Sequence, residues 1–214
     1  VRRIDSAGVV TTVAGSGPAG VNQGSFSGDG GPAVNATLQE PWDLAFDRDG
    51  NFFIADRDNH RVRKVDPNGV ITTVAGDGER RFAGDGGPAV GASLSAPLGV
   101  AVSSAGDLLI ADSGNDRVRK VDLHGMISTY LGTGTKGFSG DGGPATAATI
   151  DEPHDFAFDA SGALLVSTGD RIRRIDTAGA ISTIAGTAGT GPLPDEIPAM
   201  SGAFRGNTRP RLRR

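Results

Sequence analysis

Cysteine is absent from the 214 residues, which excludes disulfide bridges and thiolate metal ligands. Aromatic residues are scarce as well, with one Trp, one Tyr and nine Phe. No run of about 18 apolar residues occurs, so we expect no membrane-spanning helix, and the segment shows no signal peptide. The net charge of −4 argues against a phosphate-binding surface over the whole molecule, and we expect no nucleic-acid partner.

Glycine is abundant, with 34 copies, and much of it lies in turns. Residues 41–76 show the pattern best, because four short apolar segments there alternate with turns rich in Asp, Asn, Gly and Pro. Short runs of Val, Ile, Phe and Thr between such turns are typical of β-strands. Loops of a few residues make successive strands antiparallel neighbours, so the unit is predicted to be a four-stranded meander.

This unit repeats along the chain. The sequence Gly-Asp-Gly-Gly-Pro-Ala begins at Gly28, Gly84 and Gly140, so its copies are 56 residues apart. A fixed period that carries four strands is the sequence mark of a β-propeller blade, and here the extra length lies in the linkers between blades. We therefore predict an all-β fold, a β-propeller of four-stranded antiparallel blades.

The repeats also predict how the chain is divided. Blades are expected at about 42–76, 98–132 and 154–186, after a partial blade at about 1–15 that supplies two strands. Residues 187–214 lose the pattern and are expected to form an irregular Gly/Pro/Arg tail. Because about three and a half blades leave a ring open, we interpret residues 1–186 as part of a larger propeller and the chain as a fragment. The remaining blades, or a second copy, would close the ring.

These motifs resemble the NHL-repeat family of β-propellers. Residues 97–102 read PLGVAV, residues 50–56 read GNFFIAD and residues 59–66 read NHRVRKVD, as in the three parts of the family pattern. The Gly-Asp-Gly-Gly-Pro-Ala linker resembles a subgroup found in many bacterial repeat proteins. The likeness covers about residues 1–186 and implies a six-bladed ring. A shared fold does not by itself imply a shared function.

A propeller is expected to bind its partner on the face where linkers enter the innermost strands and where the second and third strands of a blade connect. Asp43 and Asp155 stand where the family pattern has Gly, preceded by Trp42 and His154. Two readings stay open, namely tolerated variation in an exposed loop, or a polar ligand site with an aromatic platform. The predicted ligand-binding residues of this top face are Trp42, Asp43, Asp58, Asn59, His60, Asn115, Asp116, His154 and Asp155.

Other repeated residues have a structural interpretation. Asp56 with Arg61, and Asp112 with Arg117, recur at the same offset, which favours a turn-closing ion pair or an Asp-to-backbone bond over catalysis. The linker carboxylates are expected to accept backbone N–H groups as Asx-turn or capping residues, and they are Asp29, Asp85 and Asp141.

Each linker also carries a proline that favours a short helix. Pro88 suits the first position of a helix, and residues 89–94 could then form one or two turns before Pro97 ends them. The linker phenylalanines are expected to pin these loops to the blades.

Resident metals and nucleophilic catalysis have little support. The chain has neither Cys nor a Gly-x-Ser-x-Gly elbow. Zinc normally takes three or four protein ligands, whereas the only histidines are His60, His124 and His154, with His124 in a turn on the opposite face. Calcium takes about six to eight oxygens, and the linker aspartates come one per loop. We expect no cofactor, and zinc or calcium is the alternative.

The chain is accordingly interpreted as a non-catalytic binding or interaction scaffold, which docks a protein, peptide or glycan on the propeller top face. The family resemblance favours a bacterial protein that is extracellular, periplasmic or on the cell surface. The alternative function is a metal-dependent propeller enzyme, a lyase or lactonase-type hydrolase with its site in the central channel.

Overall fold

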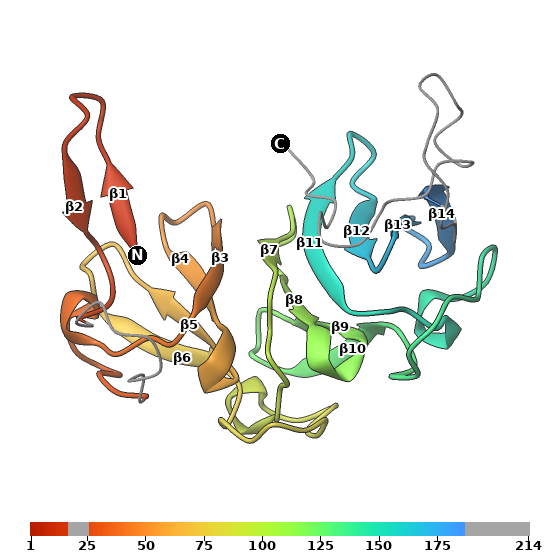
Figure 1. Cartoon of the computed structure of the whole chain (residues 1–214), viewed down its shortest axis with the longest axis horizontal. Helices are drawn as coiled ribbons and strands as arrows, with labels where there is room; N and C mark the ends of the chain where they lie inside the picture. The colour runs from red at the N-terminus through yellow and green to blue at the C-terminus, as the bar shows by residue number, and fades with distance from the viewer. Residues whose placement is uncertain (17–25, 187–214) are drawn as a thin grey trace.

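The computed structural model describes residues 1–16 and 26–186, which form four antiparallel β-sheets (Figure 1). The first sheet has two strands, β1 (Arg2–Ile4) and β2 (Val10–Thr12). The second, blade A, consists of β3 (Pro41–Phe46), β4 (Phe52–Asp56), β5 (Arg61–Val65) and β6 (Ile71–Ala75). The third, blade B, consists of β7 (Val100–Val102), β8 (Leu108–Asp112), β9 (Arg117–Val121) and β10 (Ile127–Leu131). The fourth, blade C, consists of β11 (Pro153–Phe158), β12 (Leu164–Thr168), β13 (Arg171–Ile175) and β14 (Ile181–Ala185).

The strands of each blade follow one another in chain order, because every connection within a blade is a short turn. Figure 1 shows the three blades side by side in an arc, with β3, β7 and β11 along its inner side. The predicted all-β propeller of four-stranded antiparallel blades is thereby confirmed, and the described blades form a partial propeller.

The hydrophobic core lies between the blades. Side chains alternate between the two faces of a strand, so the neighbours Leu109 and Ile110 belong to different clusters. Ile110 packs with Phe53 of blade A, and Leu109 packs with Phe156 of blade C. Blade B is therefore apolar on both faces and holds blades A and C together.

The linker between two blades bonds to both of them. The N–H of Gly86 donates to the carbonyl of Ile127 at 2.8 Å, and the N–H of Ile127 donates to the carbonyl of Gly87 at 3.0 Å. The linker thus runs along the outer strand of blade B. Its next turn bonds to the end of blade A, where the N–H of Gly76 donates to the carbonyl of Ala89 at 3.0 Å. We call the segments 26–37, 82–93 and 138–149, which repeat this arrangement, the straps.

Each strap contains one 3₁₀ turn, the shorter of the two lengths that the sequence allowed. Residues Ala89–Gly91 form the turn η3, and Pro88 precedes it in extended conformation. The chain returns to an extended conformation at Ala92, so a second turn does not form. The other straps contain η1 (Ala33–Asn35) and η5 (Ala145–Ala147). Across residues 1–16 and 26–186, no helix is long and apolar enough to cross a membrane.

Candidate binding face

Each blade buries one arginine completely, and these residues are Arg63 in blade A, Arg119 in blade B and Arg173 in blade C. The Nη2 of Arg119 donates to the Oδ1 of the strap residue Asp85 at 2.6 Å, and its Nη1 donates to the Oδ2 of Asp112 at 3.3 Å. In blade A the same two bonds run to Asp29 at 2.7 Å and to Asp56 at 3.4 Å. A buried guanidinium is stable only when carboxylates and carbonyls surround it, as they do here.

Blade C departs from this arrangement. Arg173 keeps its bond to the strap carboxylate of Asp141, at 2.8 Å. Thr168, however, takes the place that Asp112 has in blade B, and the turn that follows is two residues shorter. The Nη1 of Arg173 consequently has no hydrogen-bond partner among the described residues, and its Nε has none either, as in Arg63 of blade A.

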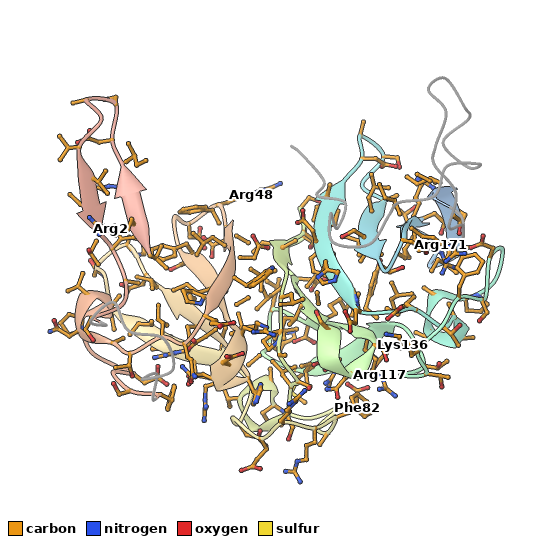
Figure 2. The ribbon with its side chains drawn as sticks, viewed as in Figure 1. Arg2, Arg48, Phe82, Arg117, Lys136 and Arg171 are labelled. Carbon is orange, nitrogen blue, oxygen red and sulfur yellow. The ribbon has the colours of Figure 1, made fainter. Side chains whose placement is uncertain are left out.

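A phenylalanine of each strap packs under two arginines of the following blade. The guanidinium carbon of Arg117 lies 3.7 Å from the centre of the Phe82 ring, and that of Arg119 lies 4.7 Å from it. Figure 2 shows Phe82 and Arg117 next to each other at the outer edge of the arc. The same pairs of cations cover Phe26 and Phe138. These contacts attach the straps to the blades, as the sequence predicts.

The aspartate that ends the second strand holds the next turn in place. The Oδ1 of Asp112 accepts the N–H of Ser95 at 2.7 Å, and its Oδ2 accepts the Asn115 amide at 2.9 Å as well as Arg119. Burial raises the pKa of Asp112 to about 6, because it removes water from the carboxylate, although these donors oppose the shift. Burial raises the pKa of Asp56 as well.

The predicted partners of these aspartates need one correction. Asp112 makes the Asp-to-backbone bond that was one of the two expectations, but its ion pair is with Arg119 and not with Arg117. The guanidinium of Arg117 instead donates to the carbonyls of Asn115, at 3.1 Å, and Thr133, at 2.6 Å. In blade A, too, the ion pair of the aspartate is with the arginine two positions beyond the expected one.

The strap carboxylates also differ from expectation. They were expected to accept backbone N–H groups, yet all three accept a buried guanidinium. Asp85 alone adds a backbone bond, from the N–H of Thr129 at 3.1 Å, together with the hydroxyl of the same residue at 2.6 Å. The charge-assisted bond to arginine is the stronger interaction, and the arginine needs it because it is buried.

On the top face, the only tryptophan of the chain is half exposed. Trp42 lies on β3 with 50% of its surface accessible, and the guanidinium carbon of Arg57 is 5.7 Å from its ring centre. Arg57 is itself paired with Glu40 and, at 3.1 Å, with Asp58. The Trp42 ring thus lies next to a cation, Arg57, that is itself held by two carboxylates.

The other inner-strand residues of the predicted site are engaged in contacts between blades or within a sheet. The Oδ2 of Asp43 accepts the N–H of Val100 at 2.9 Å, which ties β3 to β7. His154 is buried, with 8% of its surface accessible. The N–H of Asp155 donates to the hydroxyl of Ser167 at 3.1 Å.

The two predicted asparagines stabilise their own turns. The side-chain amide of Asn59 donates to Asp56 at 2.9 Å, and that of Asn115 donates to Asp112 at the same distance. Asn59 is buried, and Asn115 is partly buried. Their repeated geometry indicates a role in turn structure.

His60 and Asp116 hold neighbouring blades together at equivalent positions. The Nδ1 of His60 accepts the N–H of Ala96 at 3.1 Å, and the Oδ1 of Asp116 accepts the N–H of Glu152 at 2.8 Å. Burial lowers the pKa of His60, and the positive charge of Arg80 acts in the same direction.

Of the nine predicted binding residues, Trp42 and Asp58 both contact Arg57, whereas the others mainly serve the fold. Sequence reasoning missed Arg57 and Glu40, which complete the group around the tryptophan. Comparison of the repeats could have found them, because blade B has Ser113 where blade A has Arg57.

Within residues 1–16 and 26–186, no three His, Asp or Glu side chains form a group that could hold a metal ion. The arrangement offers an exposed aromatic platform with charged neighbours, which is suited to docking. The expectation of no cofactor, and the alternative of zinc or calcium, both stay predictions.

Comparison with known proteins identifies the repeats. The family model of the Teneurin NHL domain matches residues 5–83 and 75–139. The chain belongs to this NHL family. The assignment rests on more than half of the chain, and it confirms the NHL resemblance that the blade motifs indicate. The bacterial origin suggested by the linkers stays a prediction.

Two curated proteins show how local the similarity of these NHL repeats is. The chloroplastic protein SUPPRESSOR OF QUENCHING 1 of Arabidopsis thaliana is 34% identical over 100 residues, which are 46% of this chain and 9% of that protein. Teneurin-1 of Mus musculus is 35% identical over 102 residues, which are 42% of this chain and 4% of that protein. The chain spans less than a tenth of either relative.

Among solved structures, a protein of unknown function from Bacteroides thetaiotaomicron is similar with a TM-score of 0.56 and 24% sequence identity. The similarity covers 82% of this chain and 39% of that one. At this level of identity it supports the fold of the NHL blades and says nothing of their ligand.

Proposed function

We propose that this NHL domain is a non-catalytic scaffold that docks a protein or peptide on its top face, at Trp42 and Arg57. The observation that carries the proposal is the half-exposed Trp42 ring with the Arg57 guanidinium above it. Tryptophan and arginine are the residue types that most often dominate the free energy of protein–protein binding.

The setting of the pair supports this function. Trp42 belongs to a sheet strand, and Arg57 is held by Glu40 and Asp58, so little side-chain freedom is lost when a partner binds. One cation between two carboxylates gives no continuous positive track for a nucleic acid. A glycan, whose rings also stack on tryptophan, is the other partner class that the sequence leaves open.

The test uses Trp42 as its own reporter, because the chain has no other tryptophan. Peptides selected from a displayed random library on the whole chain are expected to change the Trp42 emission. Their affinity, measured with labelled peptide, is expected to fall at least about tenfold in Trp42→Ala, equivalent to about 1.4 kcal/mol. Leu123→Ala is the control, because Leu123 is 73% exposed in the turn at the other end of β9.

Peptides that bind Trp42→Ala as tightly as the unchanged chain would overturn the proposal. A glycan array read with the same two variants separates the partner classes, since binding of glycans alone that depends on Trp42 would replace the peptide by a glycan. Stoichiometric zinc or calcium in the purified protein, with no peptide dependence on Trp42, would favour the propeller enzyme instead.

A further inference from the structure

In blades A and B one carboxylate joins two hydrogen-bond donors at the end of the second strand. The Oδ1 of Asp112 accepts the N–H of Ser95 at 2.7 Å, and its Oδ2 accepts the Nη1 of Arg119 at 3.3 Å. Blade A repeats both bonds through Asp56. A backbone N–H and a buried guanidinium are therefore bridged by the two oxygens of a single carboxylate.

Blade C has both donors and lacks this acceptor. Thr168 occupies the place of Asp112, since each stands opposite the first arginine of the next strand. The Nη1 of Arg173 is buried and has no hydrogen-bond partner among the described residues. The N–H of Asp151, which occupies the place of Ser95, likewise donates to no acceptor within residues 1–16 and 26–186.

The turn that follows Thr168 does not supply a substitute. It still lies against Asp151, because a Cβ added to Gly169 would be 3.3 Å from the Cβ of Asp151. The turn has only two residues, and its one ionisable side chain, Asp170, pairs at 2.6 Å with Arg171, which Figure 2 labels. No side chain of the turn therefore takes over the role of the carboxylate.

The charges around Arg173 also differ from those of the other blades by one carboxylate. In blades A and B the buried arginine lies between two carboxylates, whereas Arg173 pairs with one, Asp141, at 2.8 Å. The carboxylate of Asp151 pairs with Lys136 at 2.9 Å. A monovalent anion beside the Nη1 of Arg173 would therefore give blade C the same balance, one guanidinium between two anions.

We propose that the corner of blade C between Arg173 and Asp151 binds a small carboxylate anion of the size of formate or acetate. One oxygen accepts from the Nη1 of Arg173 and the other from the N–H of Asp151, as the two oxygens of Asp112 do in blade B. Charge-assisted bonds of this kind are the strong ones. The complete burial of Arg173 restricts the ligand to the smallest acids. This site is separate from Trp42 and does not depend on the proposed docking function.

The test titrates the whole chain with sodium formate at pH 7 and follows the backbone amide signals by NMR. The amide proton of Asp151 is expected to shift downfield and to saturate, because it gains a charge-assisted hydrogen bond. The amides of Gln39 and Ser95 are internal controls, since each already donates to a carboxylate at 2.7 Å. Sodium chloride at the same ionic strength controls for screening.

Thr168→Asp is the matched variant, because it supplies the carboxylate from within the chain. Its Asp151 amide is expected not to respond to formate, while the other amide signals show that it is folded. The unfolding equilibrium constant of the unchanged chain is expected to fall about tenfold at about ten times the dissociation constant of formate. That of Thr168→Asp is expected to change no more in formate than in chloride.

An Asp151 amide that does not move with formate would overturn the inference, because water then satisfies the guanidinium. A shift that does not saturate below about 0.1 M, where salt already screens exposed charges, would reduce the site to an adventitious ion only and overturn it as well. The same holds for equal shifts in formate and chloride, or for a formate-dependent shift that persists in Thr168→Asp. None of these outcomes involves Trp42, so the docking function stands or falls separately.

Discussion

The Nη1 of Arg119 lies 3.3 Å from the Oδ2 of Asp112, and both side chains are 0% exposed. At pH 7, above the raised pKa of about 6, Asp112 is ionised and balances the buried guanidinium. We expect Asp112→Ala to lower the free energy of unfolding by about 1–3 kcal/mol, because it leaves the Nη1 of Arg119 and the N–H of Ser95 without their acceptor, while Asp85 still pairs with the guanidinium. Urea denaturation at pH 7 measures this change.

The control for this pair is an ion pair at the surface. Asp107 lies 3.7 Å from the Nζ of Lys120, and both side chains are partly exposed. Asp107→Ala is expected to change the free energy of unfolding by less than about 1 kcal/mol. Equal losses of unfolding free energy in Asp112→Ala and Asp107→Ala would show that the buried ion pair stabilises the fold no more than the surface pair.

Blade C allows the reverse experiment. The Nη1 of Arg173 has no partner among the described residues, and Thr168 occupies the position from which Asp112 reaches Arg119 in blade B. We expect Thr168→Asp to raise the free energy of unfolding by about 1–3 kcal/mol, because it supplies an acceptor to a buried donor. Thr168→Val is the control, since it keeps the shape without the carboxylate. A stability at or below that of Thr168→Val would contradict the prediction.

The ring of Phe82 is expected to contribute through its two cations. Phe82→Leu keeps an apolar side chain but removes the π-face beneath Arg117 and Arg119. The expected loss of unfolding free energy is about 0.5–2 kcal/mol. Phe158, at 38% exposure against 39% for Phe82, provides the control variant Phe158→Leu. Thermal or urea unfolding of Phe82→Leu and Phe158→Leu measures the two losses. An equal loss of unfolding free energy in both variants would assign the effect to packing area alone.

Gly99 lies against the backbone of blade C. A Cβ at this position would be 2.1 Å from the carbonyl oxygen of His154, so Gly99→Ala must push blades B and C apart. We expect a loss of about 1–3 kcal/mol in unfolding free energy. Gly91→Ala is the control, because a Cβ there meets nothing within 4 Å and Ala147 fills the same place in the next strap. If Gly99→Ala left the free energy of unfolding unchanged, the interface between blades B and C would accommodate the added methyl group at no cost in stability.

His60 is expected to make stability depend on pH. Its folded pKa lies below 6.5, so the unfolded chain binds more protons in this range and stability falls as the pH drops from about 6.5. His60→Asp copies Asp116 and can accept the same N–H from Ala96 without titrating there. Urea unfolding of both chains between about pH 8 and 5 measures the difference.

The stability of the unchanged chain must be compared with that of His60→Asp at each pH, because the titration of Asp112 changes stability in the opposite direction to that of His60. Its folded pKa of about 6 lies above its unfolded value, so its titration makes stability fall as the pH rises from about 4 to about 6. Asp112 is present in both chains, and its contribution cancels. A difference curve that does not change with pH would contradict the role given to His60.

The fold could be predicted from the sequence because the same meander pattern occurs three times in full and once in part. Apolar runs, turn residues and the 56-residue spacing all indicate the same meander, and local signals of this kind are read without knowledge of distant contacts. For the linkers, Pro88 and Ala89 favour a helical start and leave one or two turns open, whereas the hydrogen bonds of the strap to Gly76 and to β10 accompany a single turn.

The binding face was predicted less well, for a physical reason. Its residues were chosen as polar side chains in loops, and the sequence does not tell which loop side chains are occupied by structural bonds. His60, Asn59 and Asp116 looked like ligand contacts, yet each accepts or donates a bond inside the fold. Trp42 was found because it precedes Asp43, which stands where the family pattern has Gly. Arg57 was missed because its meaning depends on the neighbouring ring.

The straps have a consequence for how such chains can change in length. Each strap bonds to the end of one blade and to the outer strand of the next, so the same backbone hydrogen bonds recur at each of the three straps. Stability is then a sum of like nearest-neighbour contributions. A gene that gains or loses one 56-residue unit of blade and strap would keep the same backbone contacts between the blades that remain. Duplication or loss of whole units therefore offers a gradual evolutionary route to wider or narrower rings.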